Sequence, residues 1–194
     1  EGSYTVFDLE TTGFSAFSDS IIEIGAVRLE KGKKVGEFSE FVRPNGKIPE
    51  KIIHLTGITD AMVQGAEPIE DVLPRFIDFA KGSILVAHNA DFDIGFLREK
   101  AFELGLPIEP VYLDTLGLAR ALHPEYKNHK LDTITKQLQV PLFHHHRAID
   151  DAAATAGAFE RLMMEWREEG LPLEKINQTP SDFPLSRHDA DELL

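Results

Sequence analysis

Two carboxylates stand at the end of a short apolar segment near the start of the chain. The run Tyr4-Thr-Val-Phe-Asp-Leu-Glu10 is typical of a β-strand, and Thr-Thr-Gly ends it. Because side chains alternate along a strand, Asp8 and Glu10 point to one face, with Cα atoms about 6.6 Å apart, while Leu9 points into the core. We expect so apolar a strand to be central, where ionised carboxylates must be paired or bound to metal. Taken alone, the motif fits a solvent-facing strand end better.

A second group of polar residues follows the next apolar strand, Ile84 to Ala87. It reads His88-Asn-Ala-Asp-Phe-Asp93 and opens a helical segment. Ligand groups in open α/β sheets collect beyond the carboxyl ends of strands. We therefore predict that Asp93, in the first helical turn, reaches the metal site. We interpret Asp91 as the N-cap of the helix.

The third group is His144-His-His-Arg-Ala-Ile-Asp-Asp151, which runs from a loop into the last long helix. Asp151 could join the earlier carboxylates, and a loop histidine could reach the same site. Three adjacent histidines also suggest zinc. However, neighbouring side chains do not easily converge on one ion, and there is no His-Glu-x-x-His arrangement. The plain alternative is a solvated histidine cluster.

The oxygen-rich ligand set determines which metal we expect. Carboxylate oxygens favour Mg²⁺ or Mn²⁺ over zinc. Four carboxylates carry more charge than one Mg²⁺ usually receives, and they suit two ions about 3.5–4 Å apart, the arrangement used for in-line phosphoryl displacement.

The hydrophobic pattern predicts an α/β fold that places these groups. An N-terminal antiparallel meander of three strands precedes alternating helices and strands, which together form a mixed sheet flanked by helices. The strands are expected at 4–10, 21–29, 35–42, 84–87 and 111–113, the short helical turns at 49–62, and the helices at 69–80, 91–104, 115–122, 131–138 and 149–166. Asp114 is expected to be a helix cap or a hydrogen-bond anchor.

Composition limits the classes of protein that fit. The 194 residues suit one domain at 1–167, followed by a Pro- and Asp-rich linker or tail at 168–194. With no cysteine, disulfides and thiolate zinc sites are excluded, and a cytoplasmic location is expected. No apolar run suits a membrane span, and Glu1-Gly2-Ser3 does not resemble a signal peptide. The net charge of -13 argues against a broad duplex-binding surface.

Together the three groups resemble the DEDDh subgroup of the DnaQ-like 3′–5′ exonucleases, from about Tyr4 to about Met164. The motifs are Phe7-Asp-Leu-Glu-Thr-Thr-Gly13, His88-Asn-Ala-Asp-Phe-Asp93, and a histidine five positions before an aspartate. Three motifs in the right order seldom match by accident. Within the family, the proofreading exonuclease domain of PolC-type bacterial DNA polymerase III is most similar, through Leu55-Thr-Gly-Ile-Thr59, Pro124-Glu-Tyr-Lys-Asn-His-Lys-Leu131 and His145-His-Arg-Ala-Ile149.

The third motif fits two registers, His145 with Asp150 and His146 with Asp151. The family pattern His-x-Ala-x-x-Asp-Ala matches only the second register. The resemblance thus implies a ribonuclease H-like fold with two Mg²⁺ or Mn²⁺ ions. It implies His146 as general base and, as metal ligands that also serve catalysis, Asp8, Glu10, Asp93 and Asp151.

Further residues near these motifs are candidates for substrate contacts. Backbone groups at Thr11, Thr12 and Gly13 could hold the terminal 3′-hydroxyl, because glycine allows close approach. Phe14 could stack on the last base or equally be a core aromatic. His88 and Asn89 could contact phosphate or brace the site.

The expected activity is release of nucleoside 5′-monophosphates from a single-stranded DNA 3′ end, as proofreading in replication. The expected partner is a polymerase subunit, or polymerase domains of the same chain. Gln137-Leu-Gln-Val-Pro-Leu142 resembles a peptide that binds the sliding clamp, but we favour a structural role for it. Two alternatives remain: an RNA-trimming exonuclease of the same family, and a non-catalytic module that binds strand ends.

Overall fold

The computed structural model describes residues 2–171. Its strands are β1 (Ser3–Thr11), β2 (Ile21–Glu30), β3 (Lys33–Phe41), β4 (Ile84–Ala87) and β5 (Tyr112–Asp114). Its helices are α1 (Glu50–Thr56), α2 (Asp60–Gln64), α3 (Ile69–Ala80), α4 (Ala90–Glu103), α5 (Thr115–Leu122), α6 (Leu131–Gln137) and α7 (Ala148–Glu168). From residue 172 on, the linker expected at 168–194 lies outside the described residues, and the division into domains stays a prediction.

The five strands form one mixed sheet in the order β3-β2-β1-β4-β5. β1 pairs antiparallel with β2, and β2 pairs antiparallel with β3. β4 runs parallel to β1, and β5 runs parallel to β4. The predicted meander, the mixed sheet and the central place of the first strand are therefore confirmed.

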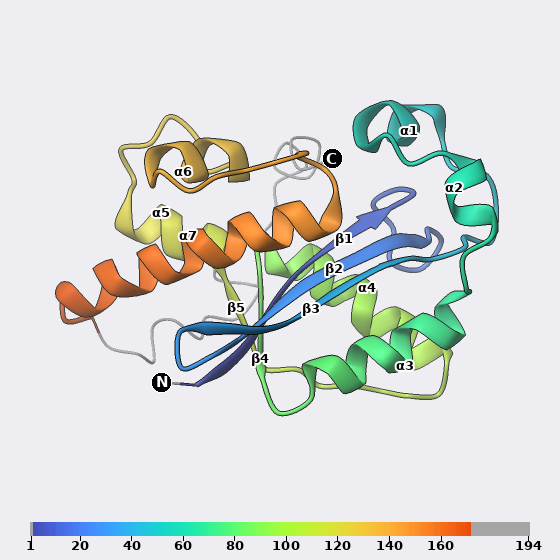
Figure 1. Cartoon of the computed structure of the whole chain (residues 1–194), viewed down its shortest axis with the longest axis horizontal. Helices are drawn as coiled ribbons and strands as arrows, with labels where there is room; N and C mark the ends of the chain where they lie inside the picture. Colours follow the sequence, from blue (N-terminus) through green and yellow to red (C-terminus); the bar gives the residue numbers. More distant parts are fainter. Residues whose placement is uncertain (1, 172–194) are drawn as a thin grey trace.

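Side-chain alternation along β1 divides the core into two layers. Val6 belongs to the core beneath α5, α6 and α7. Phe7 and Leu9 belong to the core beneath α3 and α4 on the opposite face. Figure 1 shows α7 crossing one face of the sheet, with α5 and α6 beside it and α3 and α4 on the other side. Asp8 and Glu10 therefore continue the row that faces α7.

The three parallel strands end at one edge of the sheet. β1, β4 and β5 share a direction, so their carboxyl ends lie at the same edge. β1 is also where the sheet changes from antiparallel to parallel pairing, the kind of position beside which α/β sheets bind ligands. The strand-end residues Glu10, His88 and Asp114 are thereby gathered on this edge.

The start of α4 differs from the prediction that Asp91 is its N-cap. The helix begins earlier, with Asn89 as N-cap in the left-handed region at φ 67°. The backbone N–H of Asn89 donates to Asp114 Oδ1 at 2.9 Å, and Asp91 instead accepts from the Tyr112 hydroxyl at 3.5 Å. A carboxylate from β5 thus replaces the expected local cap. The prediction for Asp114 is confirmed, since it also accepts from Leu116 N at 2.9 Å.

The apolar side chains of the segment that resembles a clamp-binding peptide pack against the core. Leu138 is buried, and Val140 packs against the cluster that includes α7. A Cβ on Gly157 of α7 would come within 2.7 Å of Val140 Cγ1, so helix and loop are in close contact. This burial supports the structural role favoured for the segment.

Within residues 2–171, none of the helices combines the length and apolar character that a membrane crossing needs.

The first turn of α7 rests directly on the backbone of β2 at Gly25. A Cβ at Gly25 would lie 2.3 Å from Ala148 C and 2.3 Å from Ile149 N. Gly25 also pairs with Asp8 across the β1–β2 ladder. The missing side chain therefore lets the helix that carries Asp151 descend next to the strand that carries Asp8.

Replacing this glycine should force α7 away from the sheet. We expect Gly25→Ala to lower the free energy of unfolding by about 1–3 kcal/mol, because the new methyl group overlaps backbone atoms that cannot rotate away. Urea unfolding monitored by circular dichroism measures the change. Gly46→Ala is the matched control, since a Cβ there meets nothing within 4 Å. Equal stability of the two variants would contradict the close approach.

Candidate metal centre

Three of the predicted carboxylates meet beneath the first turn of α7. Asp8 and Glu10 come from β1, and Asp151 comes from α7. Each offers one carboxylate oxygen, and these oxygens all lie within 4.8 Å of one another. Glu10 and Asp151 are buried, and Asp8 is partly buried. Convergence of segments more than 140 positions apart in sequence is thus observed for three of the four acids.

Asp93 lines the same cavity as these three acids, together with His88, Asn89 and Phe92. Its side chain is buried, and a hydrogen bond from the backbone of Leu9 holds it against β1. Among the described residues, Asp93 is not part of the group whose oxygens lie within 4.8 Å. It therefore borders the carboxylate cluster from the α4 side.

The clustered acids raise one another's affinity for protons. Burial raises the pKa of Asp8 well above its usual value, and the charges of Glu10, Asp151 and Asp93 raise it further. Burial raises the pKa of Glu10 as well, followed by the charge of Asp151. For Asp93, burial and then the charge of Asp114 act in the same direction. Ionised carboxylates in this arrangement need a positive charge beside them.

An unsatisfied oxygen indicates where such a charge fits. Asp8 Oδ2 is buried and has no hydrogen-bond partner within residues 2–171. Buried polar atoms are rarely left without a partner, so this oxygen points to a ligand. A divalent cation bound by carboxylate oxygens would satisfy Asp8 and offset the repulsion between the acids. The residues present therefore suit a hard metal ion.

His145 and His146 both adjoin Asp151, but through different atoms. His145 Nδ1 donates to Asp151 Oδ1 at 2.8 Å, and His145 also lines the cavity. His146 donates through its backbone N–H to Asp151 Oδ2 at 3.0 Å. The two rings stack with centroids 3.8 Å apart. Both candidate histidines therefore contact Asp151, His145 through its ring and His146 through its backbone.

The protonation of the two histidines is biased in opposite directions. Burial lowers the pKa of His145, but its hydrogen bond to Asp151 and the charge of that acid outweigh burial, so the pKa is raised. Burial and then the neighbouring His145 lower the pKa of His146. His146 is therefore the ring more readily kept neutral.

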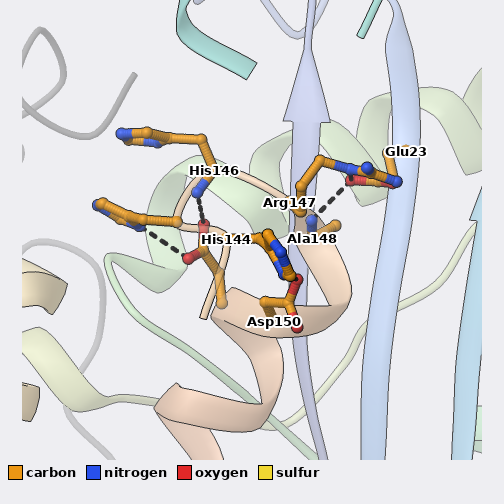
Figure 2. A network of polar contacts seen from close by, with 8 residues as sticks. Glu23, His144, His146, Arg147, Ala148 and Asp150 are labelled. Atoms are coloured by element: carbon orange, nitrogen blue, oxygen red, sulfur yellow. Dashed lines mark hydrogen bonds and ion pairs between the residues drawn. The ribbon is translucent and has the colours of Figure 1, made fainter. Parts of the chain in front are cut away.

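Two of the three adjacent histidines come close together beside Asp151. Ligand atoms of His145, His146 and Asp151 lie within 4.8 Å of one another. The backbone explains this, because His144 and His146 have positive φ values of 43° and 72°. Figure 2 shows the His146 side chain directed to one side of this turn and Arg147 to the other. Strained backbone of this kind needs support from the surrounding structure.

His88 supports the site from behind through both ring nitrogens. Nε2 lies 2.7 Å from the His129 carbonyl, and Nδ1 lies 2.9 Å from Thr115 Oγ1. Burial lowers the pKa of His88 to about 4, so the ring is neutral at pH 7. Because a carbonyl only accepts, Nε2 carries the proton and the Thr115 hydroxyl donates to Nδ1. Bracing, rather than phosphate contact, is the role this geometry favours.

Asn89 offers the cavity an unused acceptor. Its Oδ1 is buried and has no hydrogen-bond partner among the described residues. Since Asn89 also lines the cavity, this oxygen is available to a ligand.

The residues after β1 form a compact turn at the rim of the site. Thr11 Oγ1 donates to the Gly13 carbonyl at 2.7 Å, and Thr12 Oγ1 accepts from Ser20 N at 2.9 Å. These hydroxyl groups build the turn, which leaves backbone groups as the candidates for substrate contact. Phe14 is 44% exposed and lies edge-on to Phe92, with ring centroids 6.3 Å apart. This exposure favours stacking over a purely structural role.

Two acidic residues that the sequence did not assign to the site support its helices. Glu23 of β2 is buried and accepts from Arg147 and from Ala148 N at the start of α7. Asp114 holds the start of α4, and burial raises its pKa to about 6. A signal for Glu23 was present, because it is the one charged residue in the apolar run 21–27.

Comparison with known proteins gives a family match and close relatives. Residues 5–159 match the family model described as Exonuclease. The PolC-type DNA polymerase III of Caldanaerobacter subterraneus subsp. tengcongensis is 50% identical over 171 residues, which is 88% of this chain and 12% of the relative. The PolC-type enzyme of Bacillus subtilis is 44% identical over 174 residues, again 88% and 12%. The chain thus spans about an eighth of the length of these relatives.

Solved structures agree with this match. Exonuclease X in complex with 5′ overhanging duplex DNA has a TM-score of 0.72 and 30% identity, covering 90% of this chain and 97% of that chain. E. coli Exonuclease I in complex with a dT13 oligonucleotide has a TM-score of 0.77 and 17% identity, covering 88% and 43%. The second likeness shows the fold alone. Together they confirm the expected ribonuclease H-like fold.

Removing one of the clustered charges should stabilise the metal-free protein. We expect Asp8→Asn to raise the free energy of unfolding at pH 7 in EDTA by about 0.5–2 kcal/mol, as other changes that relieve strained functional sites do. The native pKa of Asp8 is raised, so the native state binds protons before the unfolded state does. The destabilising contribution of Asp8 to the wild type therefore shrinks as the pH falls from 7 toward about 4, the pKa of an aspartate in the unfolded chain. The stability advantage of Asp8→Asn over the wild type shrinks with it.

Urea unfolding at several pH values measures both effects. Mn²⁺ should stabilise the wild type and leave Asp8→Asn nearly unchanged. Asp78→Asn, on the exposed side of α3, is the control and should change stability by less than about 0.5 kcal/mol. A metal-free Asp8→Asn protein less stable than the wild type would contradict the repulsion between the acids.

Proposed function

The chain belongs to the exonuclease family, and we propose that its carboxylate centre removes nucleotides one at a time from the 3′ end of a DNA strand. The products are nucleoside 5′-monophosphates and a shortened strand. The observation that carries the proposal is the convergence of Asp8, Glu10 and Asp151 in one cavity that Asp93 also lines. All four motif acids are available there.

The metal requirement follows from the donor set. Asp8, Glu10, Asp93 and Asp151 would together hold two Mg²⁺ or Mn²⁺ ions, the hard cations that carboxylate oxygens prefer. When bound, these ions supply an activated water and compensate the charge that develops on the leaving 3′ oxygen. The raised pKa values of Asp8, Glu10 and Asp93 describe the protein without them.

His146 is the proposed general base. It fits the family pattern His-x-Ala-x-x-Asp-Ala together with Asp151, and its own backbone N–H is anchored to that acid. Nδ1 of His145 is already occupied by Asp151. His146 would take the proton from the attacking water, a contribution of about 10²–10⁴ in rate.

The rim of the cavity supplies the proposed substrate contacts. Backbone groups of the turn at Thr11, Thr12 and Gly13 would hold the 3′-hydroxyl, and Phe14 would stack on the terminal base. Stacking of this kind contributes about 1–3 kcal/mol per base. The free Oδ1 of Asn89 would accept a hydrogen bond from the nucleotide, while His88 braces the site.

DNA as the substrate and a replicative setting rest on the relatives. Exonuclease X was solved with duplex DNA, and the chain is 44–50% identical to a part of several PolC-type polymerases. We infer that this chain proofreads, working beside a polymerase subunit or polymerase domains. Contact with a sliding clamp finds no support, because Leu138 is buried and Val140 packs against the core.

The direction and product of cleavage test this proposal. Single-stranded DNA labelled at its 5′ or its 3′ end should, with Mn²⁺, lose mononucleotides from the 3′ end only. Asp93→Asn should lower the rate by at least about 10²-fold, because a charge in the metal site is removed. Internal cleavage fragments would contradict the proposal. Faster hydrolysis of the matched RNA would favour RNA trimming, and strand binding without metal-dependent cleavage would favour the non-catalytic module.

The choice between the two histidines makes a separate prediction. His146→Ala should lower kcat by about 10²–10⁴, with little change in the Mn²⁺ concentration for half-maximal activity. Because the base must be neutral, the wild-type rate should rise with pH through the pKa of His146, which lies below its usual value, and the variant should lose this dependence. His144→Ala is the control, since 80% of that side chain is exposed. A larger loss of kcat in His145→Ala would assign the base to His145.

A further inference from the structure

A buried carboxylate outside the four motif acids holds the start of α7. Glu23 lies on β2, directly across from Glu10 in the β1–β2 ladder, and is 1% exposed. It accepts hydrogen bonds from Ala148 N at 2.6 Å, from Arg147 Nη2 at 2.9 Å and from Arg147 Nε at 3.2 Å. These contacts join residues about 125 positions apart in the sequence. Glu23 is thus a long-range link between the sheet and this helix.

Glu23 supplies the cap that α7 lacks locally. The N-cap residue of α7 is Arg147, and its side chain makes no capping hydrogen bond. The first N–H groups of a helix need acceptors, and a carboxylate also interacts favourably with the positive end of the helix dipole. Figure 2 shows Glu23 beside Arg147 and Ala148, on the opposite side of the turn from His146.

The arginine partner is itself held in place. Arg147 lies over the Phe41 ring at 5.1 Å from its centroid, and its guanidinium donates to Glu23 through two nitrogens. Arg147 and Glu23 therefore neutralise each other next to the acidic cluster. Among the described residues, Glu23 lies outside the groups whose ligand atoms are within 4.8 Å of one another, so Glu23 is not a further metal ligand.

The turn that Glu23 holds is also the turn that carries Asp151, one of the proposed metal ligands. The Asp151 N–H donates to the Arg147 carbonyl at 3.0 Å, which is the first helical hydrogen bond after the cap. The carboxylate of Asp151 in turn accepts from His145 Nδ1 and His146 N. The position of Arg147 therefore sets the position of Asp151 and of the histidine loop. Gly25, two residues beyond Glu23, provides the space in which this turn sits.

We propose that Glu23 is a positioning residue that seats the first turn of α7 through Ala148 N and Arg147, so that Asp151 and the histidine loop reach the Asp8–Glu10 pair. This inference rests on the metal site proposed above. Its consequence is that Glu23 controls metal affinity without touching metal or substrate. Partners that orient metal ligands from behind typically affect metal affinity by about 10–100-fold.

Metal binding measured directly tests this role in the full 194-residue chain. The electron paramagnetic resonance signal of free Mn²⁺ gives the dissociation constant without relying on activity. Glu23→Ala should raise that constant by about tenfold, because both contacts to α7 are lost. Glu23→Gln should raise it less, because the amide oxygen can still accept from Ala148 N. The KM for single-stranded DNA at saturating Mn²⁺ should change by less than about twofold.

A second ion pair serves as the matched control. Glu40 of β3 accepts hydrogen bonds from two guanidinium nitrogens of Arg75 on α3. Helix α3 covers the face of the sheet opposite to α7 and carries none of the proposed metal ligands. Glu40→Ala and Glu40→Gln therefore repeat the two substitutions at a more exposed ion pair outside α7, and the Mn²⁺ affinity of both variants should match the wild type. Melting temperatures in EDTA report the stability of each variant separately from its metal binding.

The outcomes separate this inference from the proposed function. If the wild type binds no Mn²⁺, the proposed metal function fails. If the wild type binds Mn²⁺ and Glu23→Ala binds it equally well, with only a lower metal-free melting temperature, Glu23 is merely structural and the inference is overturned. A rise in KM at unchanged Mn²⁺ affinity would also overturn it, by assigning the Glu23–Arg147 pair to the substrate.

Discussion

The central physical constraint in this molecule is the repulsion among carboxylates that must be both buried and close together. Asp8, Glu10 and Asp151 bring oxygens within 4.8 Å of one another, and burial raises the pKa of the first two. Such a cluster cannot form through its own attraction, since without a cation every member disfavours the others. The rest of the fold must supply the free energy that holds the acids together.

The fold meets this constraint by fixing each ligand-bearing segment independently of the ligands. β1 is held by partners on both sides, β2 and β4, so alternation alone directs Asp8 and Glu10 toward α7. The two helices that bring the remaining acids begin in the same way. Neither α4 nor α7 is capped by its own N-cap side chain, and each has early N–H groups held by a carboxylate from a strand, Asp114 and Glu23 respectively. The start of each helix is thereby fixed to the sheet that carries Asp8 and Glu10.

The features that the sequence predicted depend on local rules, and those it missed depend on distant partners. Strand periodicity was sufficient for the meander and for the shared face of Asp8 and Glu10. The N-cap assigned to Asp91 was wrong, because the acceptor for the start of α4 comes from β5, 25 positions away. The convergence of His145 and His146 required positive φ values, which residue type alone does not predict for histidine. The roles that the motif implies for single residues stay predictions, since they concern bound metal and DNA.

The acidity of the chain is consistent with a site of this kind. A net charge of -13 repels phosphate over most approaches, and the buried acids repel it most strongly where cleavage is proposed. On the proposed function, a strand end would enter once divalent cations have offset the charge of the carboxylates. Metal and DNA would then bind synergistically, because each ion held by the acids would also attract the phosphate. The repulsion among the acids would thus make the cavity selective for a metal-loaded state, and the supports at Glu23 and Asp114 would keep the acids in place until that state forms.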